Sequence, residues 1–114
     1  MNNVTLIGYL GSDAETRNTR NESVLTTLSL ATQRFWKDRE SGERQSQTTW
    51  HRLVVFGRLA EFAATLSKGA HLHISGALST RQYTAKDGTT KYVTEIRVQR
   101  INCLDRSPKQ EVAA

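Results

Sequence analysis

Residues 48–69 read TTWHRLVVFGRLAEFAATLSKG, and two different hydrophobic patterns meet there at Gly57. From Thr48 to Gly57 apolar and polar residues alternate with a period of two, which is typical of a strand with one buried face. From Arg58 to Ser67 the apolar residues instead recur at the spacing of one helix face: Leu59, Phe62, Ala63 and Leu66. Gly69 follows, as is common just beyond a helix end. The stretch therefore predicts a strand followed directly by a short amphipathic helix.

Four further segments alternate with a period of two, two on each side of this stretch: residues 4–10, 24–32, 71–78 and 92–103. The predicted order is three strands, one helix and two strands. That order favours an all-β fold, a small, partly open five-stranded Greek-key barrel of the OB type with one short helix between strands three and four. An SH3-like barrel is the alternative, but it gives no natural place to an amphipathic helix at that point.

Two connections are long, polar and charged, and both are predicted to extend as solvated β-ribbons. Residues 37–47 join the second and third strands, and residues 84–91 join the fourth and fifth, with Asp87-Gly88 as a hairpin-turn signal. Nothing is periodic from Asp105 onward. We therefore expect one domain over residues 1–104 and a short disordered tail over 105–114.

Composition points to an anionic partner and away from membranes. Sixteen Lys and Arg against eleven Asp and Glu give a net charge of +5 in a chain of 114 residues. No apolar run approaches the roughly 20 residues that span a bilayer, and the first residues lack the layout of a signal peptide. The single cysteine excludes an internal disulfide and a Cys-based zinc site. These features predict a cytoplasmic protein, associated with the nucleoid and with no membrane contact.

Catalytic and metal-binding patterns are missing from the sequence. His71 and His73 share one strand face, but no acidic residue lies within two positions of them, and nothing brings His51 to the same place. Metal ligands normally come in sets of three or four. The nucleophile, zinc-protease and phosphate-loop motifs are all absent. The sequence therefore predicts no enzyme, no cofactor and no metal.

The third predicted strand carries the most informative face. Because side chains alternate along a strand, one face holds two aromatic rings and two arginines: Trp50, Arg52, Val54, Phe56 and Arg58. The other face, with His51, Leu53 and Val55, resembles core. Unpaired arginines are costly to bury, whereas rings that stack on bases beside guanidinium groups that bind phosphates suit a nucleic-acid surface. Ordinary core with arginines reaching past it is the alternative. The strand alone leaves both interpretations open.

Two further clusters place aromatic residues beside basic ones where the predicted ribbons begin. They are Phe35-Trp36-Lys37 and Arg81-Gln82-Tyr83. Most basic residues lie on predicted strands rather than in loops: Arg34, Arg52, Arg58, Arg81, Arg97 and Arg100. Together these features favour a nucleic-acid-binding groove over a bland solvated surface.

Residues 1–105 resemble the bacterial single-stranded DNA-binding proteins. The resemblance is carried by several segments in the expected order: NNVTLIGYLG at 2–11, TWHRLVVFGRLAE at 49–61, LSTR at 78–81, DG at 87–88 and YVTEI at 92–96. It implies an OB fold, a homotetramer built from paired dimers, and single-stranded DNA bound without sequence specificity around the tetramer.

The resemblance also implies roles for particular residues. Stacking falls on Trp36, Trp50 and Phe56, and the place of a fourth family tryptophan is taken by Tyr83. Basic contacts fall on Arg52, Arg58, Arg81 and Lys91. Arg34 and Lys37, on either side of Trp36, complete the predicted DNA-binding set. His51 matches a family histidine at the subunit interface.

Two features depart from the family pattern. Tyr9 stands where an asparagine is usual, and the sequence ends in KQEVAA instead of a long tail with an acidic tip. We therefore expect no binding to partners that recognise such a tip. The expected setting is DNA replication, repair, recombination or uptake. The alternative function is an OB-fold accessory protein that acts mainly through protein contacts in a primosome or recombination complex.

Overall fold

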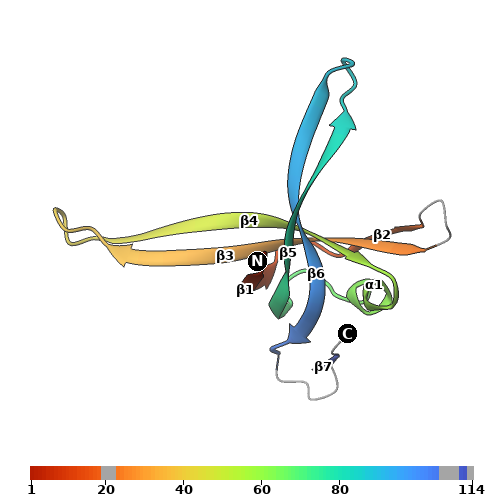
Figure 1. Ribbon diagram of the computed structural model, residues 1–114. Helices are drawn as coiled ribbons and strands as arrows, with labels where there is room; N and C mark the ends of the chain where they lie inside the picture. The colour runs from red at the N-terminus through yellow and green to blue at the C-terminus, as the bar shows by residue number, and fades with distance from the viewer. Residues whose placement is uncertain (19–22, 106–110, 113–114) are drawn as a thin grey trace.

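Seven strands and one helix make up the part of the chain that the structure, a computed structural model, describes: residues 1–18, 23–105 and 111–112 (Figure 1). In chain order they are β1 (Val4–Leu10), β2 (Glu15–Asn18), β3 (Val24–Lys37), β4 (Arg44–Phe56), α1 (Arg58–Ala63), β5 (His71–Thr84), β6 (Thr90–Cys103) and β7 (Glu111–Val112).

Five of these strands form the barrel, in the order β1-β5-β6-β4-β3. β1 also pairs with β3, through Tyr9 and Leu10, so the barrel is closed rather than partly open. Neighbouring strands are antiparallel except β4 and β6, which are parallel and joined by the pairs Leu53–Ile96 and Val54–Arg97. With α1 between β4 and β5, this is the predicted OB fold, and the prediction is confirmed.

The core is formed by the inward faces of the barrel strands. Its fully buried members include Leu30, Leu53, Leu72 and Ile74. Burial of each such side chain contributes about 1.5–3 kcal/mol to folding. The register between β5 and β6 shifts at Gly76, which changes the inward positions of β6 from even to odd numbers: Ile96 and Val98, then Ile101 and Cys103.

The helix ends earlier than the sequence pattern predicts. α1 stops at Ala63, and the amide of Thr65 bonds three residues back to the Phe62 carbonyl, which also accepts a 2.7 Å bond from the Thr65 hydroxyl. This local bonding replaces the next helical turn. Leu66 is still buried, but it lies in the turn that follows. At the other end, Gly57 has a φ of 70°, a backbone conformation that suits glycine and turns the chain from β4 into α1.

Two long ribbons extend beyond the barrel in different directions, as predicted (Figure 1). β3 and β4 stay paired out to Lys37–Arg44, and β5 and β6 out to Thr84–Thr90. β2 was not expected; it pairs with β3 at the edge of the sheet and is exposed along its length.

The chain after Asp105 is described only at Glu111 and Val112, which pair with the end of β6. Residues 106–110 and 113–114 of the predicted tail lie outside the described residues, so the division at residue 104 stays a prediction. Within the described ranges, no helix has the length and apolar character needed to cross a membrane.

Candidate nucleic-acid interface

The outer surface of the barrel carries a groove of about 340 Å³, here called the central groove. Five strands, β2 to β6, contribute its lining: Arg17, Leu25, Thr27, Arg52, Val54, Phe56, Ser79, Arg81, Glu95 and Arg97. Four of these side chains are arginines and one is a glutamate. The groove is therefore strongly basic, as a binding site for a polyanion must be.

Aromatic rings border the central groove on two sides, in hollows that share Arg52 with it. One hollow is lined in part by Trp50, and the other by Arg81, Tyr83 and Val93 at the base of the β5–β6 ribbon. Trp50 is 60% exposed, Phe56 42% and Tyr83 43%. These rings are not barrel core. Arg52 lines the groove and both hollows, so the three rings border one surface.

The position of Trp50 depends on a glycine. A Cβ atom placed on Gly11 would come within 2.2 Å of the six-membered ring of the Trp50 indole. Real Cβ atoms do not approach other atoms so closely. Gly11 is therefore the residue whose missing side chain lets the indole lie against the backbone that follows β1.

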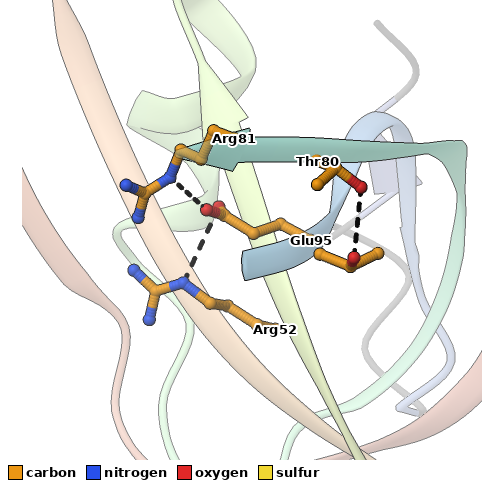
Figure 2. Close-up of polar contacts among 5 residues, drawn as sticks. Arg52, Thr80, Arg81 and Glu95 are labelled. Atoms are coloured by element: carbon orange, nitrogen blue, oxygen red, sulfur yellow. Dashed lines mark hydrogen bonds and ion pairs between the residues drawn. The ribbon is translucent and has the colours of Figure 1, made fainter. Parts of the chain in front are cut away.

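A buried carboxylate joins the two arginines at the centre of the groove. Glu95, on β6, is only 3% exposed. It accepts a hydrogen bond from Nε of Arg81 on β5, and its other oxygen lies 3.6 Å from Nε of Arg52 on β4 (Figure 2). The arginine side chains remain 53% and 43% exposed. The buried member of this group is therefore Glu95, and its two arginine partners stay accessible from outside.

Phe56 is partly covered by a fourth groove residue. The guanidinium carbon of Arg97 lies 4.7 Å from the centre of the Phe56 ring, within the range of a cation–π contact. One face of the ring is therefore already occupied by a cation.

The structure separates Trp36 from Trp50. In an antiparallel pair, opposite residues point to the same side and successive residues alternate. Trp50 lies opposite Ala31, five positions before Trp36, so the two indoles belong to opposite sides of the β3–β4 ribbon. Trp36 lines a separate hollow of about 510 Å³ farther along the ribbon, with Lys37, and Arg34 lies 5.4 Å from its ring centre.

Of the other predicted DNA-binding residues, one lies beside the groove and one does not. Lys91 is paired with Tyr83 across the β5–β6 ribbon, on the same side as the groove. The expectation that Arg58 continues the strand face is wrong, because the strand ends at Phe56 and Arg58 is the first residue of α1.

His51 lies next to Trp50 in sequence but faces the other way. It is half-buried, and its Nε2 is 2.8 Å from the Thr32 hydroxyl on β3. Burial lowers the pKa of the His51 imidazole below its ordinary value. Across the described residues, no three His, Cys, Asp or Glu side chains are grouped so as to hold a metal ion.

Sequence reasoning missed several features of the site. Arg17 reaches the groove from the unpredicted β2, and Glu95 is bonded to arginines on two other strands. Tyr92, on the outer part of β6, is 66% exposed and was given no role. Its position in an alternating strand beside a polar ribbon was the available signal.

Comparison with known proteins agrees with this geometry. The sequence model of the Single-strand binding protein family matches residues 1–104. The structure of the Plasmodium falciparum SSB complex with ssDNA superimposes with a TM-score of 0.82 and 32% identity, covering 92% of this chain and 96% of that one. A deletion mutant of the single-stranded DNA-binding protein from Thermus aquaticus gives a TM-score of 0.79 and 34% identity, covering 93% of this chain and 51% of that one.

The family match spans nearly the whole chain, and both structural neighbours share about a third of its sequence. The chain belongs to the Single-strand binding protein family.

Proposed function

We propose that this protein binds single-stranded DNA without sequence preference along the surface that contains the central groove. Bases stack on Trp50, Phe56 and Tyr83, while phosphates pair with the arginines between them. The observation that carries the proposal is that Arg52 lines the groove and both hollows, so three exposed rings border one surface that carries four arginines. Every base has a stacking face, so such a surface does not select a sequence.

The structural neighbour from Plasmodium falciparum supports the same ligand, because that protein is seen in a complex with single-stranded DNA. The alternative, an accessory protein that acts mainly through protein contacts, is not favoured by these comparisons. We further infer a role in covering exposed strands during replication, repair, recombination or uptake. From the proposed DNA ligand we infer an association with the nucleoid in the cytoplasm. From the family we infer a binding protein rather than an enzyme.

We propose that the ribbons lengthen the DNA path. Lys91 beside Tyr83 extends the basic surface along the β5–β6 ribbon. Arg34, Trp36 and Lys37 form a second stacking and phosphate-binding region on the opposite side of the β3–β4 ribbon. Arg58 on α1 is exposed, and we propose that it contacts DNA that continues past the groove around the barrel.

We propose that the chain assembles as a homotetramer with His51 at a subunit contact. The resemblance to the bacterial family supports this assembly. So does β1, whose residues Val4 to Gly8 pair with β5 on one side and with no described strand on the other. Unpaired edges favour association with another chain. Ile7 and Tyr9 on the same strand are more than half exposed in the single chain, as expected for large side chains that another subunit would cover.

The direct test is fluorescence, because the chain has two tryptophans and both are placed on proposed DNA-binding surfaces. Addition of oligo-dT should quench most of the emission, and duplex DNA of the same length should quench little. Unchanged emission at saturating oligo-dT would show that neither indole meets the DNA.

A further inference from the structure

Glu95 is the one charged side chain that is buried among the described residues. It lies in the floor of a groove whose proposed ligand is an anion, where a negative charge weakens binding by itself. An isolated buried carboxylate is also costly to folding. A group with both disadvantages requires a compensating contribution, and its two arginine partners indicate what that contribution is.

The geometry of the contacts leaves the arginines free to bind. A guanidinium group has five N–H donors in a planar fork, of which Nε supplies one. Arg81 donates its Nε–H to one oxygen of Glu95, and Nε is also the nearest atom of Arg52 to the other oxygen. In Figure 2 the terminal nitrogens of both arginines point away from the carboxylate. Each arginine therefore keeps its outer edge for a second anion.

The contacts also fix the spacing of the two cations. Arg52 comes from β4 and Arg81 from β5, and Glu95 lies on β6 between them. Without Glu95 between them, these two long cationic side chains would repel one another and sample many rotamers. The cost of ordering a flexible side chain reduces affinity when it is met on binding. The contacts with Glu95 order both arginine side chains in the free protein, so this ordering is not required when DNA binds.

We propose that Glu95 is a positioning residue for single-stranded DNA binding, which holds Arg52 and Arg81 as a fixed pair whose outer edges receive backbone phosphates. The inference rests on the proposed function and deepens it: the phosphate does not displace Glu95, but binds the edge that Glu95 leaves open. Glu95 itself does not touch DNA.

The first test is a double-mutant cycle on oligo-dT affinity at fixed salt, with the variants Glu95→Gln, Arg52→Gln and their combination. Glu95→Gln removes a negative charge from the groove, so simple electrostatics predicts tighter binding. Loss of positioning instead predicts that Glu95→Gln binds roughly tenfold more weakly. That loss is similar in size to the interaction energies measured between contacting residues. Arg52→Gln should then cost clearly less when combined with Glu95→Gln than alone. Glu61→Gln, an exposed carboxylate on α1, is the matched charge control and should leave affinity nearly unchanged.

The second test leaves Glu95 in place and does not depend on the stability of its variant. Arg52→Lys and Arg81→Lys keep the charge but lack the planar fork that serves two anions by different edges. Each should weaken oligo-dT binding severalfold, whereas Arg100→Lys, on the same strand as Glu95 but outside the groove, should not.

Binding by Glu95→Gln at least as tight as wild type, additive effects in the cycle, or full activity of both lysine variants would overturn the positioning role. Any of these with normal wild-type binding leaves the proposed function intact. Failure of the wild-type protein to bind oligo-dT would instead contradict the proposed function.

Discussion

The indole of Trp50 is well exposed, yet its six-membered ring lies against the backbone at Gly11. A ring held on one face and open on the other is ready to stack on a base without further ordering. Tyr83, at the base of the β5–β6 ribbon, presents a smaller ring to the same surface. At the scale of single residues, the site is a set of rings and cations held in place by neighbours that do not themselves meet the ligand.

Replacement of Trp50 by alanine should weaken oligo-dT binding by about 1–3 kcal/mol, the usual contribution of one stacked base. Because Trp50 is outside the core, the far-ultraviolet circular dichroism and melting temperature should change little. Trp36→Ala should cost a similar amount by removing the second stacking region. If Trp50→Ala unfolds the protein, the indole supports the barrel and the stacking role is wrong.

Gly11→Ala tests the support beneath Trp50. The new methyl group would clash with the Trp50 indole, so the indole must move away from the backbone at residue 11. We expect a shifted emission maximum in the free protein and DNA binding weakened by about 1 kcal/mol, less than full loss of the stacked base. In a Trp50→Ala background the same substitution should have almost no effect on binding. An equal effect in both backgrounds would mean that Gly11 acts through the strand rather than through Trp50.

How far the sequence could predict these residues depends on how local their signals are. Trp50, Arg52 and Phe56 follow from alternation along a single strand. Glu95 does not, because its partners lie on two other strands and only the closed barrel brings them together. Its position in β6, in an alternating run with Val93 and Arg97, marks it as outward-facing, and the burial beneath two arginines has no sequence signature.

At the scale of elements, β4 separates two environments. Its outward side carries the groove, and its inward side carries core residues together with the half-buried His51. The strand pattern predicted this division correctly. It failed at Arg58, where Gly57 turns the chain into α1. It made no prediction of the side on which Trp36 lies, which is set by the register of β3 with β4. β2 was missed because all four of its residues are exposed and show no alternation.

The burial of His51 predicts a pH-dependent stability. Its folded-state pKa lies below the ordinary value of 6.5, so the unfolded chain takes up a proton first as the pH falls. The free energy of unfolding should therefore decrease from about pH 7 down to the folded-state pKa. His51→Gln, which can still bond Thr32, should lose this part of the dependence. Urea denaturation of both proteins at several pH values measures the difference, and identical pH profiles would contradict it.

At the scale of the whole molecule, two ribbons extend from a small barrel (Figure 1). The barrel also carries the central groove and the free side of β1. The ribbons carry aromatic and basic residues away from the barrel. This arrangement suits a DNA strand that is longer than one copy of the chain can contact. The free side of β1 suits contact with another copy.

The proposed homotetramer predicts that sedimentation equilibrium at micromolar concentration gives four times the chain mass of 12.8 kDa. His51→Lys, which places a long cation at the proposed contact, should shift the population toward smaller species. A monomer at that concentration would contradict the proposed assembly. An unchanged mass for His51→Lys would contradict the placement of His51 at the subunit contact.

We propose that the basic groove and its rings bind single-stranded DNA together, and a titration with oligo-dT over a range of salt concentrations measures both contributions. Tryptophan quenching reports the stacking, and its salt dependence reports the phosphate contacts. We predict strong quenching and a plot of log affinity against log salt with a slope of about −2 or steeper, because three or more phosphates each contribute about −0.7. A slope near zero, or binding without quenching, would contradict the account.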